Sequence, residues 1–131
     1  MKRMTQQLFG LGLAVVLGST AAWAGERGSG YVVINTLSQY AYGSIGGARN
    51  SPDSTQFLYL SVWSNGTTES VVVVAQDAAG VTMSCYSYEP LMVAAARAVT
   101  SDAYISFSWT SSGRCTGLDV RAASITPPKN P

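Results

Sequence analysis

Apolar and polar residues alternate along several short segments, and a period of two is typical of β-strands. The clearest alternation is Ala103–Trp109, where Ile105, Phe107 and Trp109 share one face. Phe57–Trp63 alternates as well, with its leucines and Val62 on one face and its aromatic residues on the other. The same criterion, with β-branched and aromatic content, predicts further strands at Tyr31–Leu37, Tyr40–Ile45, Val81–Tyr88 and Cys115–Ala122.

The segment Ser70–Gln76 has a different pattern, because it contains four consecutive valines. A continuous apolar run of this length is typical of a strand covered on both faces. We therefore expect Ser70–Gln76 to be a central strand of the domain.

Turn-forming residues separate these segments. Asn65-Gly66 is a strong hairpin signal, because this pair readily adopts positive φ. The stretches Asp77–Gly80 and Thr110–Gly113 predict two more turns, and Ala48–Ser54 predicts a loop. The one helix expected is Pro90–Val99, in which proline suits the first helical position and three alanines favour the helix.

This order of elements predicts a mainly β fold with one short helix. Tight turns favour antiparallel pairing, and short strands with one inserted helix suit a small barrel of the OB type. The alternative is an antiparallel sheet with the helix packed on one face. We expect a flexible lead at residues 25–30, a single domain at 31–125 and an extended tail at 126–131, where prolines prevent pairing.

The first 24 residues are typical of a cleavable signal peptide. Lys2 and Arg3 give a positive start, Leu8–Leu17 is an apolar stretch too short to span a bilayer, and Ala22-Trp23-Ala24 predicts cleavage before Gly25. We therefore expect a periplasmic or secreted protein with no membrane insertion after processing. In an oxidising compartment the two cysteines, Cys85 and Cys115, predict one disulfide.

Charge and chemistry restrict the function. After the signal peptide there are six basic and seven acidic residues, and the basic ones are scattered, which argues against a nucleic-acid partner. The chain has no histidine, so triads and imidazole bases are excluded, and we expect no catalytic residue, metal or cofactor. A carboxylate pair remains the alternative for an enzyme, drawn from Asp53, Glu69, Asp77, Glu89, Asp102 and Asp119.

The aromatic residues are the best functional indication. Tyr59, Trp63, Tyr86 and Tyr88 lie on or beside strands, and tyrosine and tryptophan suit both sugar stacking and protein interfaces. Core or edge packing is the alternative for each of them, and it is the favoured interpretation for Trp109.

The layout resembles the B subunits of pertussis-like toxins: a Cys-bearing strand at Met83-Ser84-Cys85-Tyr86, a short helix at Leu91–Val99, then a strand at Tyr104–Trp109. That family implies an OB-fold, a pentameric ring and glycan binding, but no sugar-binding residue transfers to this chain. Runs such as Arg49-Asn50-Ser51 and Ser112-Gly113-Arg114-Cys115 also resemble small exported bacterial proteins of unknown function.

These observations predict a non-catalytic binding module that recognises a glycan or a protein through Tyr and Trp surfaces. A homo-oligomer is left open. The alternative is an envelope structural or inhibitor-like protein whose partner is another protein.

Overall fold

The computed structural model describes residues 28–131. The predicted signal peptide and residues 25–27 of the predicted lead lie outside the described residues. Among residues 28–131, no helix is both long and apolar enough to cross a membrane.

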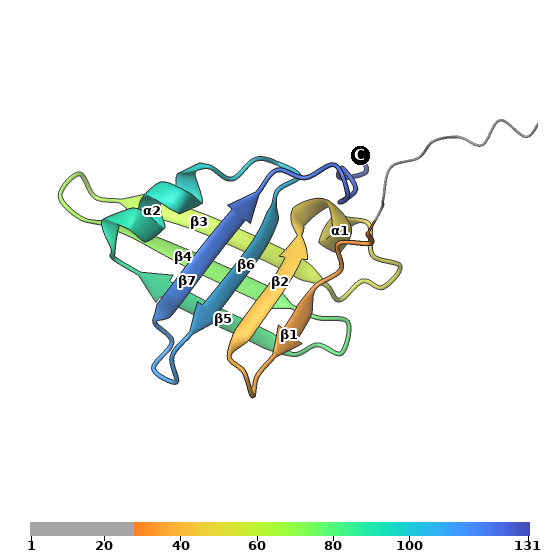
Figure 1. Ribbon diagram of the computed structural model, residues 1–131, viewed down its shortest axis with the longest axis horizontal. Coiled ribbons are helices and arrows are strands. Elements are labelled where there is room, and N and C mark those ends of the chain that lie inside the picture. The colour runs from red at the N-terminus through yellow and green to blue at the C-terminus, as the bar shows by residue number, and fades with distance from the viewer. Residues whose placement is uncertain (1–27) are drawn as a thin grey trace, which may run out of the picture.

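Residues 28–131 form two antiparallel sheets and two short helices (Figure 1). A four-stranded sheet has the order β1-β2-β6-β7, with bounds Val33–Asn35, Tyr40–Ser44, Tyr104–Trp109 and Cys115–Arg121. A three-stranded sheet has the order β3-β4-β5, with bounds Phe57–Ser64, Glu69–Gln76 and Thr82–Ser87. The helices are α1, Ile45–Arg49, and α2, Pro90–Arg97.

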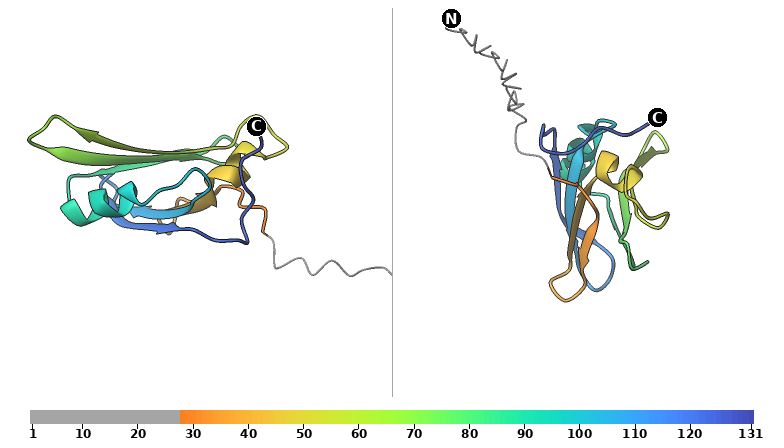
Figure 2. Two further views of the ribbon diagram at one scale, coloured as in Figure 1. Left: turned by 90° about the horizontal axis from the view of Figure 1, so that it is seen from above. Right: turned by 90° about the vertical axis from the view of Figure 1, so that its right-hand side faces the viewer.

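The two sheets pack face to face as separate layers, and their strands cross instead of running side by side (Figures 1 and 2). The expected mainly antiparallel β fold is confirmed. The closed OB-type barrel is wrong, because β3 pairs only with β4 and β1 only with β2, so the sheets do not join into one. The alternative, an antiparallel sheet with a helix packed against it, matches the fold better, with a second sheet completing the sandwich.

The core lies between the two sheets and is built from their inward positions. On β4, Val71 and Val73 are fully buried and lie opposite Val62 and Leu60 of β3. On β6, Phe107 is almost fully buried and pairs with residues of β2 and β7. Trp109 is 5% exposed, which confirms its assignment to the core.

The prediction that β4 is buried on both faces is wrong. The strand is central, since it pairs with both β3 and β5. Its outward valine, Val72, nevertheless remains 36% exposed, because no second layer of the described residues 28–131 covers that face. The consecutive valines therefore place apolar side chains on the surface as well as in the core.

Helix α1 was not expected from the sequence, which predicted a strand to Ile45 and a loop from Ala48. Ser44 is the N-cap of this helix, because its Oγ accepts a hydrogen bond from the Gly47 backbone N–H at 2.8 Å. The adjacent chain also lies very close: a Cβ at Gly47 would lie 2.2 Å from the Gly30 carbonyl oxygen. Glycine is required there by close backbone packing, and this packing holds the short helix in place.

Helix α2 begins at the predicted residue, Pro90, and ends at Arg97, two residues earlier than expected. The Glu89 side chain makes no capping bond. The Ser87 hydroxyl instead accepts from the Glu89 backbone N–H at 3.1 Å. Val93 and Ala96 are buried, so α2 covers one end of the sandwich, where it contacts β3, β4 and β7.

The C-terminal segment forms no strand, but side chains of the domain hold it in place. The Asn50 side chain donates to the Pro128 carbonyl at 2.7 Å and accepts from the Asn130 N–H at 2.7 Å. The Asp102 carboxylate accepts from the Lys129 N–H at 2.9 Å. These bonds place residues 127–130 beside α1.

The predicted disulfide is confirmed. Cys85 of β5 and Cys115 of β7 are bonded, with their Cα atoms 5.0 Å apart. Because β5 and β7 belong to different sheets, the bond joins the two layers covalently. Beside it, the Tyr86 backbone N–H donates to the Gly113 carbonyl at 3.0 Å.

Candidate functional site

The three-stranded sheet turns one face to the core and the other to solvent, and we call the solvent side the outer face. Directly paired residues share a face of an antiparallel sheet, so the strand register defines its members. The outward positions are Phe57, Tyr59, Ser61 and Trp63 on β3, Ser70, Val72, Val74 and Gln76 on β4, and Thr82, Ser84 and Tyr86 on β5.

Three of the predicted site residues belong to this face, and the fourth, Tyr88, lies just beyond the end of β5. The exposed fractions of Tyr59, Trp63, Tyr86 and Tyr88 are 53%, 56%, 38% and 53%. The fold therefore leaves all four accessible, and the core-packing alternative does not apply to them.

Two of these residues form a compact aromatic cluster. The rings of Tyr86 and Tyr88 meet edge to face, with centroids 5.9 Å apart. The guanidinium of Arg114, on the turn before β7, lies 5.2 Å from the Tyr86 ring centroid and 5.8 Å from that of Tyr88. Cation–π attraction of this kind holds the arginine flat against the rings.

A shallow hollow of about 380 Å³ lies beside this cluster, and Ser70, Val72, Ser84 and Tyr88 are among its lining residues. Trp63 is not part of its lining. Trp63 lies on β3, directly opposite Ser70 of β4. Because neighbouring strands are about 4.8 Å apart, β3 and β5 aromatics form two borders roughly 10 Å apart with the valines of β4 between them.

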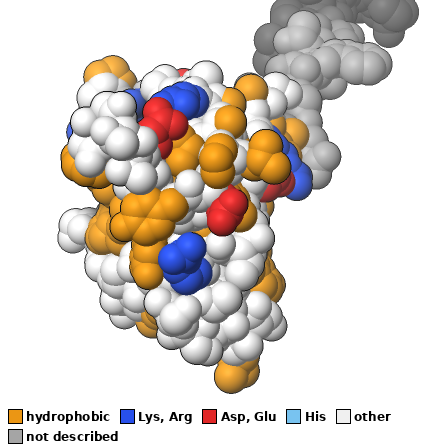
Figure 3. Space-filling model, turned by 90° about the vertical axis from the view of Figure 1, so that its left-hand side faces the viewer, with side chains coloured by type: hydrophobic (Ala, Val, Ile, Leu, Met, Phe, Trp, Pro, Cys, Tyr) orange, Lys and Arg blue, Asp and Glu red, His pale blue; other side chains and the backbone are white. Residues whose placement is uncertain are grey.

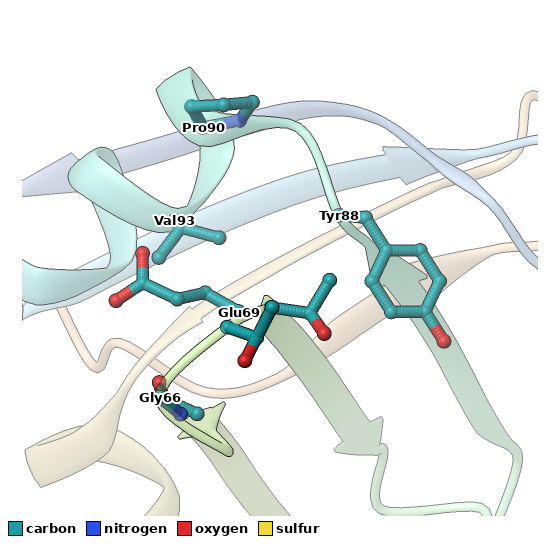
Figure 4. A pocket seen from close by; sticks show the side chains of 8 residues that line it. Gly66, Glu69, Tyr88, Pro90 and Val93 are labelled. Atoms are coloured by element: carbon teal, nitrogen blue, oxygen red, sulfur yellow. Dashed lines mark hydrogen bonds between the residues drawn. The ribbon is translucent and has the colours of Figure 1, made fainter.

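Tyr88 also lines a second hollow of about 380 Å³, which lies between the β3–β4 turn and the start of α2 (Figure 4). Val93 points from α2 toward this space, and Tyr88 stands at its other side (Figure 4). The turn is held by Asn65, whose Oδ1 accepts from the Thr67 and Thr68 backbone N–H groups at 2.9 and 2.8 Å. Tyr88 thus separates a hollow on the outer face from one at the end of the sandwich.

Charge is sparse around the outer face. The outward residues of β3, β4 and β5 include no Asp, Glu, Lys or Arg. Arg114 is a cation beside this face, where it lies over the Tyr86 ring. The adjoining end of the molecule, which carries α2, shows apolar patches with acidic and basic side chains between them (Figure 3). The outer face is therefore an apolar and hydroxyl-rich surface bordered by charge.

The carboxylates have local structural contacts. Asp53 accepts from the Gln56 and Thr55 backbone N–H groups and from the Gln56 side chain, and these bonds hold the pKa of its carboxyl below the usual value. Asp77 accepts from turn N–H groups, and Asp102 from Lys129. The ion pairs are Glu69 with Arg97 and Asp119 with Arg121, while Glu89 occupies the N-cap of α2.

Metal and thiol chemistry have no clear basis in the described part of the chain. Residues 28–131 contain no group of three or more His, Cys, Asp or Glu side chains placed to hold a metal ion. Both cysteines within that range are in the disulfide, so neither offers a thiolate.

The sequence did not indicate that a second set of tyrosines gathers on the other side of the molecule. On the solvent side of the four-stranded sheet, the rings of Tyr40 and Tyr42 stack with centroids 6.1 Å apart. The Tyr104 ring lies 6.2 Å from that of Tyr42, and Arg121 lies 5.7 Å from the Tyr104 ring centroid. Burial raises the pKa of the Tyr104 phenol above its usual value. The alternation of Tyr40 and Tyr42 was the available signal, but pairing with β6 could not be read from it.

Comparison of the chain with protein-family models, with curated proteins and with solved structures finds no match.

Proposed function

We propose that this protein is an exported, non-catalytic binding module that binds a protein partner through the outer face of its three-stranded sheet. The observation that carries the proposal is the contiguity of exposed apolar side chains on that face. Tyr59 lies directly opposite Val74, and Val72 directly opposite Tyr86. Val72 and Val74 share the outer side of β4, and Tyr86 contacts Tyr88, so a diagonal apolar band with Ser61 and Ser84 beside it crosses all three strands.

The composition of this surface favours a protein over a glycan. Cores of protein interfaces are depleted of Lys, Glu and Asp and enriched in aromatic residues and arginine, which are often the energetic hot spots. Here aromatic borders flank two valines, and Arg114 lies against the rings of Tyr86 and Tyr88. The valines offer an aliphatic centre that gains from burial against another apolar surface, whereas sugar rings are bound chiefly by aromatic faces and hydrogen bonds.

The contacts of the carboxylates support the proposal that the module is not a catalyst. Two carboxyl groups that act together in hydrolysis must flank one bond, as in glycosidases. Glu69 and Asp119 instead each pair with an arginine, and Asp53 binds the N–H groups of its own loop. An inhibitor-like or envelope structural role would use the same outer face, and the identity of the partner distinguishes them.

Site-specific photo-crosslinking tests the proposal. A photoreactive amino acid replaces Val72 on the outer face, and in the matched control it replaces Val33, a valine of similar exposure (40% against 36%) on the opposite sheet. We expect one stoichiometric protein adduct from position 72 in extract and culture supernatant of the source organism, and none from position 33. A second copy of this chain in the adduct would identify the partner as itself.

Sequencing of the N-terminus tests the export part of the proposal. The first residue of the exported product should be Gly25. An adduct of equal yield from both positions, or no adduct at position 72 together with a glycan-array signal that Tyr59→Ala abolishes, would contradict a protein partner on the outer face.

A further inference from the structure

A second hollow of different character lies on the solvent side of the four-stranded sheet, facing away from the outer face. We call it the Gly117 hollow, and its outward lining residues are Tyr40, Ser106, Ser108, Gly117 and Asp119. Its volume is about 380 Å³, which is within the range of roughly 300–1,000 Å³ that small-molecule sites occupy. The hollow shares no lining residue with the two hollows that meet at Tyr88.

The hollow exists because one outward position carries no side chain. Tyr40, Ser108 and Gly117 form a row across β2, β6 and β7, in direct register. A Cβ at Gly117 would lie 2.9 Å from the Ser108 hydroxyl oxygen, so even alanine would enter this space. The strand pair is irregular at this point, with a register shift between Ser108 and Trp109.

The wall of the hollow is a ring held in place by its neighbours. Tyr40 stacks on Tyr42 with an angle of 8° between the ring planes, and Tyr42 contacts Tyr104 in turn. Tyr40 remains 38% exposed, so one end of this tyrosine row is open to a ligand. A ring already fixed by packing loses little conformational freedom when a ligand binds against it.

The polar groups around the hollow suit an uncharged ligand with several hydroxyls. Asp119 forms an ion pair with Arg121, and this hydrogen bond raises the pKa of the arginine above its usual value. The charges of Asp119 and Arg121 cancel, so the pair does not select a cationic ligand. The carboxylate oxygens of Asp119 can still accept hydrogen bonds from ligand hydroxyls. The Ser106 hydroxyl lies in the same row as Asp119, and the Ser108 hydroxyl is bonded to Thr116 at 2.9 Å.

From these features we propose that the Gly117 hollow is a binding site for a neutral sugar residue. The C–H face of the sugar contacts Tyr40, and its hydroxyls bond to Asp119 and Ser106 over the open floor at Gly117. This site is separate from the protein-binding outer face and does not depend on it, so the module has two partners of different chemistry.

The test is a nuclear magnetic resonance titration of the ¹⁵N-labelled mature chain. The probes are the methyl glycosides of glucose, galactose, mannose and N-acetylglucosamine, with glutamate and lysine as charged controls. We expect saturable shifts of the Ser106, Gly117 and Asp119 amide signals with at least one glycoside, and none with the charged controls.

Variants locate the binding. Gly117→Ala fills the floor, and Tyr40→Ala removes the wall, so either should weaken glycoside binding by about tenfold or more. The matched control is Tyr31→Ala, the same change at a tyrosine of similar exposure (40% against 38% for Tyr40) that lines none of the hollows described above, and it should leave the affinity unchanged. Amide spectra of the free variants verify that each retains the fold.

The proposal would be overturned by no saturable shift with any of the glycosides, or by shifts that persist unchanged in folded Gly117→Ala. Shifts centred on the outer face and lost in Tyr59→Ala would overturn it equally, and would instead count against the protein-binding role of that face.

Discussion

The bond between Cys85 and Cys115 should supply a large part of the stability of this domain. The two residues are 30 positions apart, and the loop that they close contains α2 and β6. Closing a loop of this length in the unfolded chain removes about 12 cal/mol/K of entropy, which corresponds to about 3.6 kcal/mol at 25 °C. Small domains have only about 5–15 kcal/mol in total.

Urea unfolding of residues 25–131, the predicted mature chain, measures this contribution. The Cys85→Ala/Cys115→Ala variant is compared with the oxidised protein and with the protein reduced by a thiol, which keeps both sulfur atoms. With an m value of about 2 kcal/mol/M, the midpoint should fall by about 2 M in the reduced protein. The variant should lose somewhat more, because both cysteines are buried and their truncation leaves a space in the core.

The reasoning would be refuted by a reduced protein whose midpoint lies within about 0.5 M of the oxidised one at an unchanged m value. Such a result would mean that the unfolded chain gains little freedom when the bond is cut. The contacts between the layers, and not the covalent closure, would then account for the stability.

Two further predictions concern α1 and the loop that follows it. Gly47→Ala should destabilise the fold by about 1–3 kcal/mol, because its Cβ would meet the Gly30 carbonyl oxygen at 2.2 Å, and thermal unfolding followed by circular dichroism measures the loss. Asp53→Asn should flatten the acid side of the stability–pH curve. Bonds from Gln56 and Thr55 lower the pKa of Asp53, so its contribution is present above the unfolded-state pKa of about 3.9 and is lost as the pH falls through the folded-state pKa. Urea midpoints between pH 2 and pH 7 test this, and curves of equal steepness for both proteins would contradict it.

Local sequence signals identified the elements well where each signal depends on neighbouring residues. The Asn65-Gly66 turn forms as expected, with Gly66 at a φ of 87°. Pro90 begins α2, and the parity of Tyr59 and Trp63 places both on the solvent side. Such features follow from turn chemistry and from the period of two along a strand.

Features that depend on distant parts of the chain were not predictable in the same way. Helix α1 contains Gly46-Gly47, a pair with poor helix propensity, and it is held by packing against Gly30 and Pro127, which lie far away in sequence. The division of the strands into two sheets depends on which strand pairs with which, and alternation alone does not specify this. For the same reason the tyrosine row and the Gly117 hollow emerged only once β2, β6 and β7 were aligned.

The covalent link at one margin of the sandwich also determines how the molecule responds to mechanical load. The two solvent sides face in opposite directions, so tension applied between them pulls the layers apart (Figure 2). Near β5 and β7 that tension passes through the Cys85–Cys115 bond, whereas the other edge strands, β1 and β3, have no covalent link to the opposite sheet. Under force the two layers should separate first away from the disulfide and remain joined at the Cys85–Cys115 bond.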